Sequence, residues 1–210
     1  MRFQSRATNS RAASRWKASR ASILRTPASR RATGPPTDAV RGGNNDSPLA
    51  QITPANVTQL TKAWTYNTGD IRGPGDSGET TYEVTPIKIA DTVYRCTPHN
   101  IAIALDPVSG TEKWRFDPKV GRSVLRQHQT CRGVSYCRVP NATVGAPCSE
   151  RIILPAADAK LYALDAANGQ ICPTFGQNGV VDLWANMPDH SEGAYYITAA
   201  IARNLIICER

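Results

Sequence analysis

Two side chains that could do chemistry lie four residues apart in the stretch Gln127-His-Gln-Thr-Cys-Arg-Gly-Val-Ser-Tyr136. A histidine such as His128 can accept a proton or orient a hydroxyl group. Arg132 carries a planar fork of donors that binds oxygen-rich ligands through charge-assisted hydrogen bonds. Each residue also has a structural alternative, because His128 could be a loop residue without a ligand and Arg132 could pair with a carboxylate at the edge of the core.

A second pair of candidates, Asp106 and Asp165, occupies equivalent places in an internal repeat. Each aspartate ends the sequence Ala-Leu-Asp, and a glycine follows four residues later. One carboxylate at the same place in each unit is typical of a turn cap rather than of a catalytic group. By the same reasoning Trp114, at the end of the first unit, is expected to pack between units. The alternative is a chance occurrence of the same turn in two hairpins.

The elements that must position these side chains are short strands. From about Pro48 onward, β-rich runs alternate with turns that contain Gly, Asn or Pro, and no long stretch has the helical period of 3.6 residues. The runs expected to form strands are Val84–Ile89, Thr92–Cys96, Ile101–Leu105, Glu112–Phe116, Arg151–Leu154, Leu161–Leu164 and Leu205–Cys208.

The repeat selects one all-β architecture. Asp106 and Asp165 are 59 residues apart, and each unit reads as strand, turn, strand, Leu-Asp turn and strand. Units of about 40–50 residues with four strands each are the blades of a β-propeller. We therefore predict an all-β, partial β-propeller of about three blades over residues 46–210.

The net charge of +8 lies almost entirely in residues 1–45, which hold nine Arg, one Lys and one Asp. This segment is poor in apolar residues, so a disordered basic tail is expected. A transit-type presequence, a tail for nucleic acid or an anionic surface, and translation from a wrong start are the alternatives. The remaining residues carry a net charge of −1, so no nucleic-acid partner is predicted for the body. No apolar run approaches the ~18 residues of a membrane-spanning helix.

Longer motifs resemble one family, the quinoprotein dehydrogenases that bind pyrroloquinoline quinone (PQQ) in an eight-bladed propeller. The Ala-Leu-Asp…Gly…Trp unit resembles their tryptophan-docking repeat. The stretch 127–136 closely resembles the membrane-bound branch that oxidises glucose, quinate or polyols, and the similarity runs from about Ser47 to about Met187. Two further stretches carry it, Ser47–Asp70 and Glu83–Asn100.

The resemblance implies roles for residues of this chain. Glu83 matches an acidic residue that contacts PQQ, Arg132 an arginine near the quinone oxygens, and His128 a histidine near the cofactor and the sugar. It implies a sugar or polyol substrate, Ca²⁺ or Mg²⁺ as a second cofactor, and ubiquinone as electron acceptor. The catalytic base and all metal ligands come from later blades in this family, so we expect them beyond residue 210 and assign no metal ligand here.

The family works on the periplasmic side of the bacterial inner membrane, where disulfides persist. The resemblance therefore implies bridges among the six cysteines, with Cys148–Cys172 as the first choice, because both flank one hairpin-rich unit, and Cys96–Cys131 as the second. The membrane helices of the family have no counterpart here, since the basic segment stands in their place. Contact with the membrane is therefore expected only through segments missing from this chain.

About three blades cannot surround a cofactor on the propeller axis, so the chain alone is expected to be inactive. Two alternatives to an N-terminal part of a dehydrogenase stay open. One is a non-catalytic propeller scaffold for protein partners, which has no need of a histidine and an arginine on the axis. The other is a decayed gene fragment, consistent with the atypical sequences at residues 1–45 and 197–210.

Overall fold

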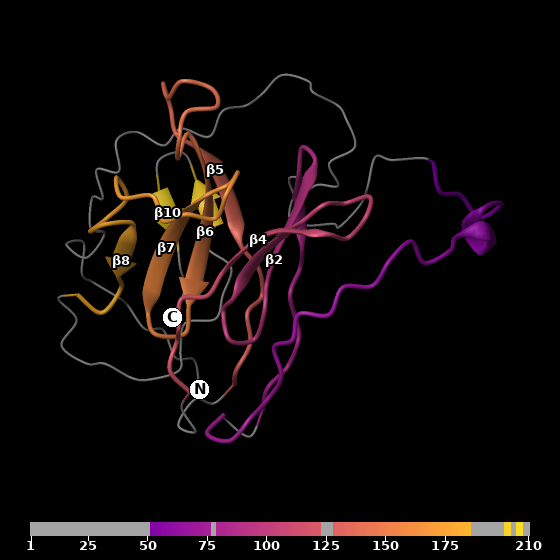
Figure 1. Cartoon of the computed structure of the whole chain (residues 1–210), viewed down its shortest axis with the longest axis horizontal. Coiled ribbons are helices and arrows are strands. Elements are labelled where there is room, and N and C mark those ends of the chain that lie inside the picture. The colour runs from indigo at the N-terminus through magenta and orange to yellow at the C-terminus, as the bar shows by residue number, and fades with distance from the viewer. Residues whose placement is uncertain (1–50, 77–78, 123–127, 186–199, 203–204, 208–210) are drawn as a thin grey trace, which may run out of the picture.

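The computed structural model describes residues 51–76, 79–122, 128–185, 200–202 and 205–207. The basic segment 1–45 and Cys208 lie outside the described residues. Two four-stranded antiparallel sheets stand side by side, and a two-stranded ribbon adjoins them (Figure 1). The elements in chain order are the 3-10 helix η1 (Val57–Gln59), β1 (Ile87–Ile89), β2 (Thr92–Cys96), β3 (Ala102–Leu105), β4 (Glu112–Phe116), β5 (Ser135–Arg138), β6 (Glu150–Ala156), β7 (Lys160–Asp165), β8 (Val180–Asp182), β9 (Ala200–Ala202) and β10 (Leu205–Ile207).

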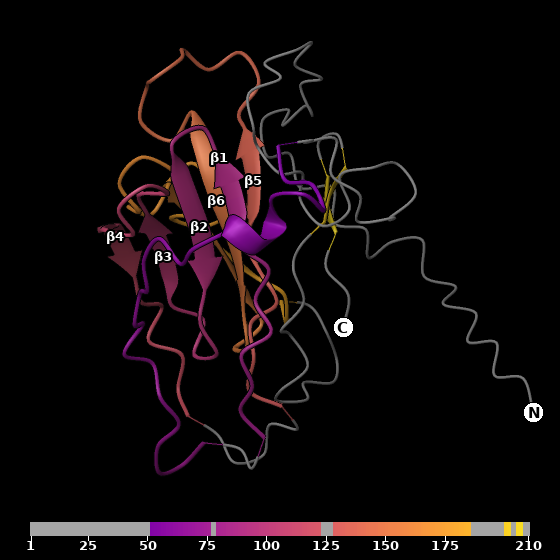
Figure 2. The same cartoon turned by 90° about the vertical axis from the view of Figure 1, so that its right-hand side faces the viewer.

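Each four-stranded sheet is a simple meander whose strands pair in chain order, β1-β2-β3-β4 and β5-β6-β7-β8. The ribbon β9-β10 forms a separate two-stranded sheet, and β9 contacts β5, the first strand of the preceding sheet. Figure 2 shows the two sheets from the side, one behind the other. This arrangement of successive four-stranded units confirms the predicted all-β fold and is consistent with a partial propeller.

The predicted strands are present, with shifts at their ends that have physical reasons. The first begins at Ile87 rather than Val84, because Pro86 has no N–H to donate to the ladder. Three observed strands, β5, β8 and β9, were not predicted from the sequence. Ser135–Arg138 is a four-residue strand with mixed polar and apolar residues at intermediate burial, so its sequence carries no strong β signal.

Two tryptophans join successive units in the same way. Trp64 covers Gly110 and Trp114 covers Gly169, and a Cβ added to either glycine would lie 2.5 Å from the indole ring. Both glycines also have a positive φ, +73° and +74°, which only glycine adopts without strain. Close contact and backbone conformation thus require glycine at both positions. The predicted packing role of Trp114, which is 8% exposed, is confirmed.

Asp106 and Asp165 cap the repeated turns, as predicted. The Oδ1 of Asp106 accepts the backbone N–H of Val108 at 2.9 Å, and the Oδ1 of Asp165 accepts that of Ala167 at 2.8 Å. Both carboxylates are occupied by the turn, so neither is a catalytic group. The Nε1–H of each docking tryptophan donates to the carbonyl directly after the aspartate, Trp64 to Pro107 at 3.2 Å and Trp114 to Ala166 at 3.0 Å.

The main core lies between the two sheets. Apolar side chains from β2, β3 and β4 meet those of β6 and β7, and Phe116 packs on Tyr162 with ring centroids 5.5 Å apart. Burial of this shared face holds one sheet against the other, since apolar burial is the dominant stabilising term. Its most deeply buried members are Cys96, Ala102, Ala104, Ile152, Leu154, Ala156 and Leu164.

An extended segment before β1 lies along the first sheet and is tied to β4. Arg115 donates through Nη2 to the hydroxyl of Tyr66 at 2.8 Å and to the carbonyl of Thr68 at 3.1 Å. Tyr66 in turn donates to Glu112. These contacts lead the chain toward Asp70 and Asp76, which enter a buried cluster described below.

Candidate functional site

The segment that holds His128 and Arg132 lies beside the segment that precedes β1. The two run parallel at Thr80 and Gln129. Backbone N–H groups alternate between them: Gln129 donates to Glu79 at 2.8 Å, Thr81 to Gln129 at 3.1 Å, and Thr85 to Arg132 at 2.9 Å. This register, set by backbone bonds rather than by side chains, places Glu83 between His128 and Arg132.

The structure brings together the three residues singled out from the sequence, Glu83, His128 and Arg132, which we call the Glu83 trio. Oε1 of Glu83 lies 3.4 Å from Nε2 of His128, and its Oε2 lies 3.4 Å from Nη2 of Arg132. Thr81 donates to Oε1 at 3.1 Å and also hydrogen-bonds His128. The Nδ1 of His128 lies 3.5 Å from Oε1 of Glu79. Glu83 is thus the centre of the group.

The trio is open to solvent on one side. The exposed fractions of the three side chains rise from 18% at His128 to 36% at Glu83 and 54% at Arg132. A guanidinium and a carboxylate that both reach solvent can exchange their mutual contact for a ligand. The group therefore offers forked donors, an imidazole and a carboxylate acceptor to an oxygen-rich molecule.

Both predicted disulfides are present. Cys96 bonds to Cys131 and Cys148 to Cys172. The first bridge is buried and joins the end of β2 to the residue directly before Arg132. Cys137 is free, and burial raises the pKa of its thiol to about 11. Because the thiolate is the reactive form, Cys137 is an inert side chain near neutral pH.

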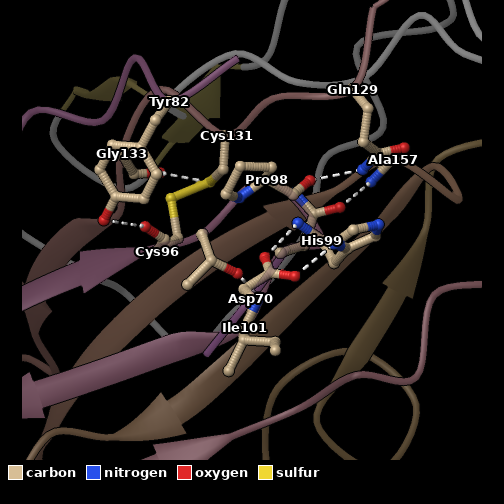
Figure 3. The surroundings of a disulfide bond; sticks show 12 residues. Asp70, Tyr82, Cys96, Pro98, His99, Ile101, Gln129, Cys131, Gly133 and Ala157 are labelled. Atoms are coloured by element: carbon tan, nitrogen blue, oxygen red, sulfur yellow. Dashed lines mark hydrogen bonds and ion pairs between the residues drawn. A yellow bond between two sulfur atoms is a disulfide. The ribbon is translucent and has the colours of Figure 1, made fainter. Parts of the chain in front are cut away.

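A second charged cluster, which the sequence did not reveal, lies beside this bridge. Both ring nitrogens of His99 face carboxylates: Nδ1 contacts Asp70 (Figure 3), and Nε2 lies 2.9 Å from Oδ1 of Asp76. The Oδ2 of Asp76 accepts hydrogen bonds from Arg122 and, at 2.6 Å, from the backbone N–H of Gly73. We call these four side chains, Asp70, Asp76, His99 and Arg122, the His99 clamp.

The His99 clamp is buried and internally neutral. The side chains of Asp76, Asp70 and His99 are 0%, 5% and 11% exposed. The hydrogen bond to Asp70 raises the pKa of His99 above 6.5, against the effect of burial. Burial raises the pKa of each aspartate, but hydrogen bonds with His99, Thr97 and Gly73 and the nearby positive charges together outweigh it, so that both pKa values are lowered from 3.8. Because each ring nitrogen faces a carboxylate, which accepts hydrogen bonds and donates none, this geometry favours the imidazolium form of His99.

From the sequence, His99 was only part of a turn, Pro98-His99-Asn100, and Asp70 only the end of a motif. One signal was available, since the chain has three histidines in all and His99 lies three residues after the end of the predicted strand Thr92–Cys96. Its partners lie 29 and 23 residues away, and no spacing rule joins them.

Within the described ranges, no group of three or more His, Cys, Asp or Glu side chains is placed to hold a metal ion. Over the same residues, no helix is both long and apolar enough to cross a bilayer.

Comparison with known proteins identifies the architecture. Residues 38–210 match the family model described as "Glucose/ethanol/alcohol dehydrogenase, beta-propeller domain", a PQQ domain. The chain is 48% identical over 161 residues to the quinoprotein glucose dehydrogenase of Escherichia coli K12, covering 75% of this chain and 20% of that protein. It is 44% identical to quinoprotein glucose dehydrogenase A of Acinetobacter calcoaceticus, covering 76% and 21%.

Solved structures share the fold. The quinohemoprotein alcohol dehydrogenase of Comamonas testosteroni superposes with a TM-score of 0.60 at 22% identity, over 84% of this chain and 23% of that one. The chain thus spans about one fifth of the length of the curated relatives it matches. With two four-stranded units linked by tryptophan docking and a family match over most of its residues, the chain belongs to the PQQ-dependent dehydrogenase β-propeller family.

Proposed function

We propose that residues 46–210 form the N-terminal part of a PQQ-dependent dehydrogenase that oxidises glucose or a related sugar or polyol. The basic segment 1–45 is a separate tail or presequence in this proposal. The observation that carries it is the Glu83 trio, because Glu83 lies 3.4 Å from both His128 and Arg132, and all three residues are expected at a PQQ site from sequence alone.

The donor set fits such a ligand. PQQ is a planar tricarboxylate with an ortho-quinone, and the chemistry it supplies when bound is the two-electron oxidation of an alcohol carbon. The guanidinium of Arg132, 54% exposed, gives forked hydrogen bonds to carboxylate or quinone oxygens and favours the more electron-rich reduced form. His128 orients a substrate hydroxyl through its imidazole nitrogen.

Glu83 has a role in this site that its sequence position did not suggest. Its carboxylate contacts both His128 and Arg132, so it orients the imidazole and the guanidinium in addition to any contact with the ligand. The catalytic base and the Ca²⁺ or Mg²⁺ ligands are proposed to lie in blades beyond residue 210. Ubiquinone as acceptor and a periplasmic location follow from the same proposal.

A chimera tests the proposal. The matching segment of the E. coli glucose dehydrogenase is replaced by residues 47–187 of this chain, and glucose-dependent dye reduction is measured with PQQ and Ca²⁺. We expect an active chimera and, for this chain alone under the same conditions, no turnover. Arg132→Ala in the chimera should weaken PQQ binding by at least tenfold.

The matched control is Arg138→Ala. Arg138 also pairs with a glutamate, Glu150, and both side chains are 38% exposed, but it lies in β5, outside the trio. PQQ affinity that is equal in the two variants would contradict the proposed role of Arg132. An inactive chimera that binds no PQQ would favour the scaffold or decayed-fragment alternatives.

A further inference from the structure

The tight turn Cys96–Asn100 lies between β2 and β3. It connects the segment that carries His128 and Arg132 to other parts of the structure. Four of its five residues hold three other segments of the chain. Figure 3 shows this turn with the disulfide on one side and His99 on the other. Thr97 closes the turn itself, accepting the N–H of Asn100 at 2.8 Å and donating to Ile101 at 3.0 Å.

Two attachments reach the segment that carries the trio. The disulfide Cys96–Cys131 ends directly before Arg132. The side-chain amide of Gln129, directly after His128, donates through Nε2 to the carbonyl of Pro98. Gln129 is 1% exposed and Cys131 is 3% exposed. The two inward-facing side chains are thus fastened to the turn, while their neighbours His128 and Arg132 reach the trio.

Two further attachments fix the turn itself. His99 is held by Asp70 and Asp76 through both ring nitrogens. Asn100, fully buried and with φ +63°, accepts through Oδ1 the N–H of Ala157 at 3.0 Å. Asn100 therefore links the turn to the connection between β6 and β7 in the second sheet. The turn is braced on three sides and cannot move without breaking buried polar contacts, each of which is costly to leave unmade.

We propose that the turn Cys96–Asn100 is the positioning element of the PQQ site, and that Cys96–Cys131 and Gln129 are positioning residues that hold His128 and Arg132 in register. This inference rests on the proposed function. Local rigidity of this kind lowers the entropy lost on binding, since the donors are already ordered when the ligand arrives.

The first experiment removes the bridge in the 210-residue chain. Cys96→Ala with Cys131→Ala is compared with Cys148→Ala with Cys172→Ala, which removes the other bridge, in the second sheet. Hydrogen exchange of residues 128–134 is measured without PQQ, and PQQ affinity is measured by titration. We expect exchange of this segment to speed up at least tenfold and PQQ affinity to fall about tenfold in the first variant only.

A second variant keeps the disulfide. Gln129→Met preserves the volume of the side chain but removes the amide that reaches Pro98, and it should give the same two effects to a smaller extent. If the Cys96→Ala, Cys131→Ala variant does not fold, Gln129→Met provides the test of the positioning role. In an Arg132→Ala background, loss of the bridge should cause a smaller additional loss of PQQ affinity than in the wild-type chain, because only its effect through His128 remains.

The outcomes separate this inference from the proposed function. If the wild-type chain binds no PQQ, the proposal that this chain contributes to a PQQ site is wrong. Hydrogen exchange of residues 128–134 still shows whether the turn orders this segment. Unchanged exchange in both test variants overturns the positioning role. Faster exchange with unchanged PQQ affinity also overturns it, and so does an equal loss of affinity in the Cys148 and Cys172 variant.

Discussion

The His99 clamp and the Glu83 trio contain the same kinds of side chain, a histidine, carboxylates and an arginine, yet they differ in what they can do. In the clamp, both ring nitrogens of His99 face carboxylates whose side chains are at most 5% exposed. In the trio, contacts are longer, and Glu83 and Arg132 are 36% and 54% exposed. The buried cluster is complete without a ligand, whereas the open one has donors to offer.

The comparison teaches that residue type does not distinguish a structural from a binding cluster. Burial and mutual satisfaction do, because a buried charge without a partner is costly while an exposed one is hydrated. The two clusters are joined through the turn Cys96–Asn100, so the structural one braces the binding one. Four measurements sharpen this contrast, and they follow in order of decreasing effect.

Breaking the clamp at its most buried member should have the largest effect. Asp76→Ala leaves the imidazolium of His99 with one carboxylate fewer in a buried setting, and we expect the free energy of unfolding to fall by about 3–5 kcal/mol. Urea denaturation measures it. The control is Asp117→Ala, whose pair with Lys119 is exposed and should contribute under about 1 kcal/mol. Equal losses of stability in the two variants would contradict the idea that burial makes the charge pairs of Asp76 more important than an exposed pair.

The clamp should also make stability depend on pH. Since the folded pKa of His99 is raised above 6.5, its contribution is complete below pH 6.5 and is lost as the pH rises through the folded value. The pKa values of Asp70 and Asp76 are lowered in the folded protein, so these groups have the opposite effect at acid pH. Their contribution to the free energy of unfolding is lost as the pH falls below 3.8. Urea midpoints across pH 5–9 should decline on the alkaline side.

His99→Gln is the control for this pH profile. The variant keeps a polar side chain that does not titrate, so its urea midpoint should be lower at pH 5 and should lack the alkaline decline that we attribute to His99. An unchanged slope in the variant would assign the pH dependence to other groups.

Arg122→Ala should have an intermediate effect. Its side chain is 44% exposed, so water replaces part of what Asp76 loses, and Gly73 still donates to the same carboxylate oxygen. We expect a loss of about 1 kcal/mol, measured by thermal or urea unfolding. A loss as large as that of Asp76→Ala would mean that Arg122 is the principal counter-charge of the clamp.

The smallest effect on stability is expected in the trio. Arg132→Ala and Glu83→Gln remove half-exposed groups and should change the free energy of unfolding by less than about 0.5 kcal/mol, although each weakens PQQ binding. Unfolding curves and PQQ titrations on the same samples test both parts. A large destabilisation by either substitution would mean that the trio stabilises the fold, as the His99 clamp does.

Much of the fold could be predicted because its signals are local. The Ala-Leu-Asp-x-x-x-Gly turn needs only neighbouring residues, and Asp106 and Asp165 cap their turns as expected. Strand β5 was missed because Ser135–Arg138 owes its structure to the adjoining β6, with which it pairs, and not to its own composition. The trio was found through resemblance in motifs, and its contacts were not predictable.

The sequence by itself determined the family, the repeat with its turn residues Asp106 and Asp165, the packing role of Trp114, and the candidates Glu83, His128 and Arg132. Only the tertiary structure decided that Glu83 lies between the other two, that Cys96–Cys131 and Gln129 fasten their segment to one turn, and that His99 is an imidazolium between two aspartates. The physical reason is that local sequence sets turns and strand patterns, whereas charge pairing and burial join residues 23 to 49 positions apart. Such separations carry no pattern until the chain is folded.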